Sequence, residues 1–158
     1  MITGPLFGIY SMSKHAIEAY TDGLAQELAR FDVSVHVIEP GTYKSNIGSA
    51  AKKRLIDTNY WPEDTLYKQE RAYVLNRLTN TDQQPDPAAV GKAALHIMQS
   101  ETPRSRYMVI ERLEQADRVL RRQLSKVLEL NEGQAHQFDR ARLVEILDEE
   151  IAKRASKK

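Results

Sequence analysis

The sequence predicts an α/β fold, in which helices cover a parallel sheet. Two short runs rich in β-branched or aromatic residues, 33–38 and 107–110, have the composition of buried strands. Around them, apolar residues recur at the i, i+3, i+4 spacing of amphipathic helices. Two strands alone make a poor sheet because both would be edges. We therefore expect the other strands of the sheet to lie outside this sequence.

A long helix is expected first, over residues 11–30, with Ser11 or Ser13 as its cap. Residues 33–38 then predict a buried strand, which a sharp turn at Pro40-Gly41 ends. The helical spacing of the first segment comes from Ala16, Ile17, Tyr20, Leu24, Ala25 and Leu28.

The middle of the chain predicts a long irregular excursion over 41–64, the kind of segment that often forms a functional lid. Its basic cluster 52–54 suits either a cofactor phosphate, an acidic partner or simple solvation. An amphipathic helix over 63–79 follows. Asp86 as cap and Pro87 at the first position then open a helix that ends near Gln99.

The C-terminal part predicts the second strand at 107–110 and two further helices, 114–130 and 138–153, which Gly133 and its polar neighbours separate. We therefore expect two domains. Residues 1–112, with a lid over about 42–80, form the first, and a helical extension, 113–158, forms the second.

The composition excludes several classes of protein. A net charge of +1 is too small for a nucleic-acid binder. The absence of cysteine excludes disulfides and thiolate metal sites and fits a cytoplasmic location. No apolar run approaches the ~20 residues that span a bilayer, and Met1–Tyr10 lacks the features of a signal peptide. No metal-ligand spacing occurs among His15, His36, His96 and His136.

The motif that carries chemistry is Tyr10-x-x-x-Lys14. Residues four apart project from the same face of a helix. A phenol is a poor base at neutral pH, but a nearby ammonium favours the phenolate, and such a tyrosine can exchange a proton with a substrate oxygen. The same spacing also occurs in ordinary exposed pairs, so by itself it leaves both interpretations open.

The wider context favours the chemical interpretation. Tyr10 opens the string YSMSKHAIEAYTDGLAQEL, and residues 33–42 read VSVHVIEPGT. This order and spacing resemble the classical short-chain dehydrogenase/reductase family over residues 9–47, and more weakly to residue 112. The resemblance implies the C-terminal portion of a Rossmann-type doubly wound parallel sheet, helix-rich and without its N-terminal βαβ units. It also implies NAD or NADP as cofactor.

The same resemblance assigns roles to individual residues. Tyr10 would be the general acid/base, and Lys14 would hold the nicotinamide ribose hydroxyls and favour the phenolate. The cofactor would also meet Pro40, Gly41, Thr42, Tyr43 and Ser45. Of these, Pro40-Gly41 would turn past the nicotinamide, the Tyr43 backbone would meet its carboxamide, and Ser45 would lie near the carboxamide or the diphosphate. Leu6, Phe7 and Ile9 would line the carbonyl pocket, and residues 44–62 would form the substrate lid.

Two parts of the family's machinery belong upstream of this sequence. The Gly-rich loop that receives the pyrophosphate follows the first strand of that fold, and the catalytic serine lies about a dozen residues before the tyrosine. We therefore expect a truncated gene model or a fragment, with Met1 an internal methionine. We also expect the 158-residue chain to be inactive alone.

The function expected is the interconversion of an alcohol and a carbonyl. Apolar residues of the lid favour a small apolar substrate: Ile47, Leu55, Ile56, Trp61 and Leu66. In the resembled family the helix over 11–30 packs against its copy, so we expect a homo-oligomer through it. Its small residues, Ala16, Ala19, Gly23 and Ala29, permit close approach. The alternative is a non-catalytic dimerisation module derived from that family.

Overall fold

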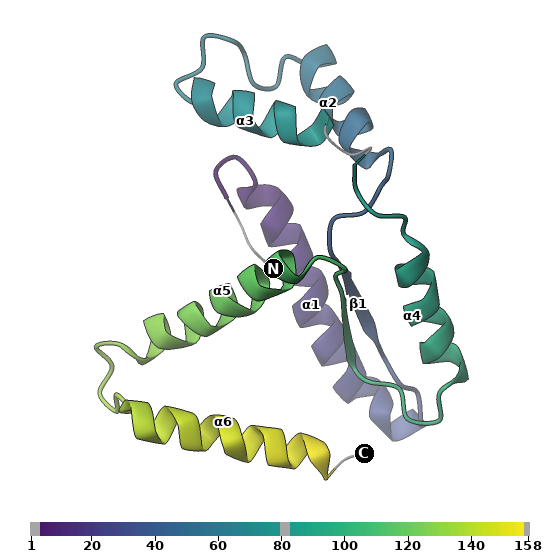
Figure 1. The fold of residues 1–158 in the computed structure, drawn as a ribbon, viewed down its shortest axis with the longest axis vertical. Helices are drawn as coiled ribbons and strands as arrows, with labels where there is room; N and C mark the ends of the chain where they lie inside the picture. The colour runs from purple at the N-terminus through teal and green to yellow at the C-terminus, as the bar shows by residue number, and fades with distance from the viewer. Residues whose placement is uncertain (1–3, 80–82, 157–158) are drawn as a thin grey trace. The chain divides into compact units, whose positions relative to one another are not determined.

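The computed structural model describes residues 4–79 and 83–156 (Figure 1). The chain forms two compact units, Met1–Ala116 and Asp117–Lys158. In chain order the elements are α1 (Gly8–Leu28), a 3₁₀ turn (Ala29–Phe31), β1 (Val37–Pro40), α2 (Ile47–Asp57), α3 (Lys68–Thr79), α4 (Ala88–Gln99), β2 (Arg106–Val109), α5 (Leu113–Asn131) and α6 (Arg140–Ala155).

A parallel pair of strands forms the sheet of the first unit. β1 pairs with β2 in a register that runs from Val37 opposite Arg106 to Pro40 opposite Val109. α1 lies on one side of the strand pair and α4 on the other (Figure 1). Parallel strands need a crossover connection, and here that connection contains α2, α3 and α4. The helix-rich α/β fold with a parallel sheet, as a partial Rossmann-like fold, is therefore confirmed.

Tyr107 of β2 is the best-buried aromatic residue in the described part of the chain, with 2% of its surface exposed. The ring of His96 from α4 meets it edge-on at 5.7 Å between centroids. The Arg104 guanidinium lies 4.4 Å from the centre of the Tyr107 ring, and the Arg104 N–H donates to the Tyr107 hydroxyl at 2.9 Å. The His96 contact attaches α4 to the sheet, and the Arg104 contacts hold the loop between α4 and β2 against Tyr107.

The first helix begins three residues earlier than the sequence predicts and ends at Leu28. Neither Ser11 nor Ser13 is its cap. A turn precedes it, in which the Phe7 N–H donates to the Gly4 carbonyl at 3.1 Å, and Phe7 is an N-cap without a side-chain hydrogen bond. The turn, rather than a hydroxyl, sets the start of the helix, so both serines lie within its first turns.

The first strand is shorter and lies further along the chain than predicted. Only Val37–Pro40 pairs with β2, whereas Val33 to His36 have no strand partner among the described residues. Because β1 is paired on one edge only, its residues are half-buried or, at Pro40, exposed, and it is not the buried strand expected.

The prediction that residues 41–64 are irregular is wrong in part, because this segment contains the helix α2. The following helix, α3, starts at Lys68 instead of residue 63. α2 and α3 pack against each other, and Arg71 of α3 donates through Nε to the Trp61 carbonyl at 2.7 Å. Val74, 1% exposed, provides the buried centre of α3. This packing explains a helix where the sequence lacks strong helical spacing.

The later helices lie within two residues of their predicted bounds at nearly every end. The N-cap of α4 is Pro87, not Asp86 as predicted, although Asp86 Oδ1 still accepts from the Ala88 N–H at 2.9 Å. Gly133, with φ of 69°, lies in the connection between α5 and α6. None of the helices in the described ranges is both long and apolar enough to cross a membrane.

Candidate active site

Tyr10 and Lys14 face each other on the first turns of α1. The Lys14 ammonium lies 5.6 Å from the centre of the Tyr10 ring, within the range of a cation–π contact. Tyr10 is 54% exposed, so its phenol is open to a reactant. The structure therefore brings the two residues of the predicted pair together, one helical turn apart.

The start of α1 orients Tyr10. The Phe7 ring meets the Tyr10 ring edge-on, with 6.3 Å between centroids. The Ser13 hydroxyl donates to the Tyr10 carbonyl at 2.8 Å, which occupies Ser13 within the helix. Ser11, by contrast, is 5% exposed. The helix thus turns Ser11 inward and leaves the Tyr10 phenol on its outer side.

The Pro40–Ser45 turn contains a position that only glycine fits without rearrangement. A Cβ on Gly41 would lie 2.9 Å from Gln115 Oε1 and 3.1 Å from the Ile110 side chain, closer than van der Waals contact allows. The Gly41 N–H donates to the Val109 carbonyl at 2.7 Å. The missing side chain therefore lets the turn pass tightly against the end of β2.

Gln115 of α5 holds the next residue of this turn. Its Oε1 accepts from the Thr42 N–H at 3.4 Å, and its Nε2 donates to the Thr42 hydroxyl at 3.1 Å. The sequence analysis missed Gln115, because nothing in its local sequence connects it with a residue 73 positions earlier.

Tyr43 turns its side chain toward the sheet. Its hydroxyl donates to the Val109 carbonyl at 3.2 Å. Burial, followed by the charge of Glu111, raises the pKa of Tyr43 above the ordinary 10.0. The Tyr43 phenol is therefore neutral and acts as a structural donor. Pro40 and Ser45 are exposed.

The predicted site residues form two groups in the structure. Tyr10 and Lys14 contact each other, and the turn contacts β2 and Gln115. Among the described residues, no hydrogen bond, ion pair or ring contact joins the two groups. Of the expected carbonyl-pocket residues, Phe7 contacts Tyr10, Leu6 is half-buried and Ile9 is 71% exposed.

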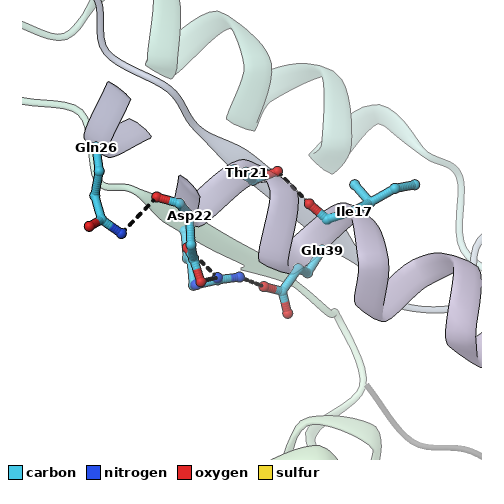
Figure 2. Close-up of polar contacts among 6 residues, drawn as sticks. Ile17, Thr21, Asp22, Gln26 and Glu39 are labelled. Atoms are coloured by element: carbon cyan, nitrogen blue, oxygen red, sulfur yellow. Dashed lines mark hydrogen bonds and ion pairs between the residues drawn. The ribbon is translucent and has the colours of Figure 1, made fainter. Parts of the chain in front are cut away.

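Arg106 attaches α1 to the sheet through Asp22 and Glu39, the two carboxylates labelled in Figure 2. Its guanidinium lies 2.7 Å from Asp22 of α1 and 2.9 Å from Glu39 of β1. Burial alone would lower the pKa of Arg106, but hydrogen bonds and charge from Glu39 and Asp22 outweigh it and raise that pKa. This permanently charged group therefore sets where α1, and with it the Tyr10/Lys14 pair, lies against the strands.

Tyr10 and Lys14 could together hold hydroxyl groups of a ligand, because a phenol and an ammonium both bond sugar hydroxyls. The described residues hold no group of three or more His, Cys, Asp or Glu that could bind a metal ion.

A family model described as short chain dehydrogenase matches residues 1–55, which contain Tyr10, Lys14 and the Gly41 turn. Residues 1–55 of the chain are thus similar to the short-chain dehydrogenase/reductase family. Curated relatives within this family include an NADPH-dependent 3-dehydrocapnine reductase from Ornithobacterium rhinotracheale. It is 48% identical over 52 residues, which cover 33% of this chain and 18% of the relative.

Longer matches extend the family likeness beyond the first strand. Retinol dehydrogenase 16 of Mus musculus is 31% identical over 108 residues, and short-chain dehydrogenase/reductase family 9C member 7 of the same species is 34% identical over 110 residues. Each of these two matches covers 63% of this chain and 34% of the relative. The chain thus spans a third or less of the curated relatives named here. No solved structure gave a significant match.

Proposed function

We propose that this chain contributes the proton-transfer half of an NAD(P)-dependent oxidoreductase that interconverts an alcohol and a carbonyl. The observation that supports this most directly is the Lys14 ammonium 5.6 Å from the centre of the exposed Tyr10 ring. The similarity of residues 1–55 to a short chain dehydrogenase model, and of the chain to reductase and dehydrogenase relatives, supports the same chemistry.

In this proposal each group has one task. Bound NAD(P) supplies or accepts the hydride. The Tyr10 hydroxyl gives a proton to the substrate oxygen in the reducing direction and takes it back in the oxidising direction. Lys14 holds ribose hydroxyls and stabilises the phenolate by its charge. The turn at residues 40–45, with Pro40, Gly41, Thr42, Tyr43 and Ser45, borders the nicotinamide through its backbone.

We further propose that residues 44–62 close over a small apolar substrate. Ile47 and Ile56 of α2 are 71% and 54% exposed, and Leu66 before α3 is 98% exposed, so these side chains are available to a ligand. A cytoplasmic location belongs to the same proposal, supported by the cysteine-free composition.

The first test is made in a longer chain that joins these residues to an upstream Gly-rich loop and serine. Tyr10→Phe removes only the phenolic hydroxyl group and is expected to lower kcat by roughly 10²- to 10⁴-fold, with NAD(P)H affinity unchanged. Lys14→Ala is expected to lower both kcat and the affinity for NAD(P)H. Tyr20→Phe is the matched control, because Tyr20 is also exposed on α1 at 68%. Full activity in Tyr10→Phe would remove the proposed acid/base.

The second test uses the 158-residue chain itself. We expect no NAD(P)H-dependent turnover, because the pyrophosphate end of the cofactor finds no Gly-rich loop in this sequence. Absorbance at the reduced nicotinamide band, with a panel of apolar ketones and aldehydes, is the measurement. A rate above the buffer blank would contradict the proposed inactivity.

A non-catalytic dimerisation module through α1 is the second candidate. The observation that favours it is the exposed apolar stripe Met12, Ile17 and Tyr20, at 66%, 51% and 68% exposure. Ala16, Ala19 and Gly23 supply small neighbours on the same helix. Ile17→Glu would then abolish self-association, and this outcome is separable from the loss of turnover in Tyr10→Phe.

A further inference from the structure

We propose that residues 117–156, here called the C-terminal hairpin, form a surface that binds a second copy of this chain. Two helices and one turn make up the hairpin: the part of α5 from Asp117, the connection around Gly133, and α6. The proposal concerns a part of the chain outside the family match and outside the candidate site, so it stands independently of the proposed function.

Each helix of the hairpin carries an uncovered apolar stripe. On α5, Leu120, Leu124 and Val127 are 55%, 56% and 52% exposed, at the i, i+4, i+7 spacing of one helical face. On α6, Val144, Leu147 and Ile151 are 42%, 51% and 57% exposed at spacings of three and four. Leu128 and Phe138 are likewise 50% and 44% exposed, and Leu130 is 79% exposed.

The apolar area matches what a stable dimer needs. Nine large side chains of the hairpin are about half exposed, some ~50 Å² of apolar surface each, which gives on the order of 500 Å² per copy. A standard interface buries about 800 Å² per partner, of which about 65% is apolar in homodimers. The apolar surface that the two helices expose together is therefore of the size that a homodimer interface uses.

The hairpin does not cover its own apolar faces. α5 and α6 make almost no contact along their lengths within the described chain. The Asn131 side chain donates to the Phe138 carbonyl and accepts from the Phe138 N–H, both at 2.9 Å, and Asp139 caps α6 by accepting from the Arg142 N–H at 2.9 Å. These bonds define the ends of the two helices and fix the connection between them.

Charge complementarity points to a second copy as the occupant. Residues 118–126 of α5 contain four basic residues and no acidic one, whereas residues 145–150 of α6 contain four acidic residues and no basic one. Both blocks lie near the middle of their helices. When α5 of one copy packs along α6 of another, in either direction, opposite charges therefore meet. The pairing of two α5 helices would instead place like charges together.

The mass of the full chain in solution is the first measurement. Light scattering after size exclusion is expected to give twice the chain mass of 18.0 kDa. Leu124→Glu combined with Leu147→Glu should raise the dimer Kd roughly 30-fold or more, as the loss of an interface hot spot does. Met98→Glu is the control, because Met98 is 82% exposed on α4 and lies outside the hairpin. Helicity by circular dichroism shows that each variant is folded.

Two variants with reversed charges distinguish contact between α5 and α6 of different copies from contact between α5 and α6 of the same chain. Replacing all four basic residues of 118–126 by Glu reverses the charge of the α5 block, and replacing all four acidic residues of 145–150 by Lys reverses the charge of the α6 block. Each variant alone should be monomeric. An equimolar mixture should recover dimers, because the reversed α5 then meets the reversed α6 of its partner and the two unchanged helices meet each other.

Three outcomes would overturn the proposal: a wild-type mass of 18.0 kDa up to high concentration, a dimer that Ile17→Glu breaks and the α5/α6 substitutions do not, or a mixture of the charge-reversed chains that remains monomeric. The second outcome would move the interface to α1, and the first would leave the stripes to a partner other than this chain.

Discussion

At the scale of single residues, the Gly41 turn packs closely against two neighbouring side chains. A Cβ there would overlap Gln115 and approach Ile110, and the same Gln115 bonds Thr42 through both its amide oxygen and its amide nitrogen. A methyl group at position 41 would therefore displace the clamp on the next residue as well. The fit of the turn against β2 depends on that one missing side chain.

We predict that Gly41→Ala destabilises the chain by about 1–2 kcal/mol, the usual cost of an inserted methyl group in a packed place. Gly23→Ala is the matched control. Nothing lies within 4 Å of a Cβ on Gly23, so replacing a glycine within a helix should stabilise by about 0.5–1 kcal/mol. Urea unfolding of the two variants measures whether each substitution raises or lowers the free energy of unfolding. Equal effects at the two positions would refute the packing argument.

The site residues that sequence reasoning placed are those whose signal is local. Tyr10 and Lys14 are four apart, and a helix brings such residues onto one face whatever else the fold does. The roles of Gln115 and Arg106 were not predicted, because their partners lie 73 and 84 residues away. Nothing in the composition near either residue indicates which distant group it meets.

At the scale of elements, the bounds of a helix are predicted well from sequence where its first residues carry a clear start signal. α4 was placed well because Asp86 and Pro87 are strong start signals, and Asp86 does bond the Ala88 N–H. α1 was placed late because two serines offered a cap that the Gly4–Phe7 turn made unnecessary. α2 was not predicted, since its packing on α3 supplies what its sequence pattern lacks.

We predict that Asp86→Ala lowers the free energy of unfolding by about 1 kcal/mol, because the Ala88 N–H loses its acceptor. Asp86→Asn keeps an acceptor oxygen and should restore most of that loss. Hydrogen exchange at the first amides of α4 should rise in the alanine variant alone. Asp64→Ala, an exposed position, should change stability by less than about 0.5 kcal/mol.

The predicted bounds of the first strand were wrong because the local sequence pattern does not determine them. Residues 33–38 have strand composition throughout, but a strand needs a neighbour, and β2 offers one only to Val37–Pro40. The hydrophobic pattern therefore predicted that a strand exists here and left its limits to pairing between distant segments.

At the scale of the whole molecule, the division into two compact units predicts two unfolding transitions. Trp61 is the chain's one tryptophan and lies in the first unit, whereas far-ultraviolet circular dichroism also reports α6 and most of α5 in the second. We expect the urea midpoint from tryptophan fluorescence to differ from the midpoint from circular dichroism. Coincident midpoints would show that the two units unfold as one.

Arg106 links three elements of the first unit that lie far apart along the chain. Its guanidinium joins Asp22 and Glu39 across 84 and 67 residues, although these partly exposed ion pairs contribute only about 1 kcal/mol or less each. Closing loops of that length costs conformational entropy before the contacts that compensate for it can form. We therefore expect this three-way junction to form after the rate-limiting barrier to folding.

The kinetic consequence is specific. Arg106→Met should accelerate unfolding and leave the refolding rate nearly unchanged, because a contact absent from the transition state affects only the unfolding limb of the chevron. Stopped-flow fluorescence of Trp61 measures both rates. α1, and with it Tyr10, would then reach its final position against the strands only in the last phase of folding.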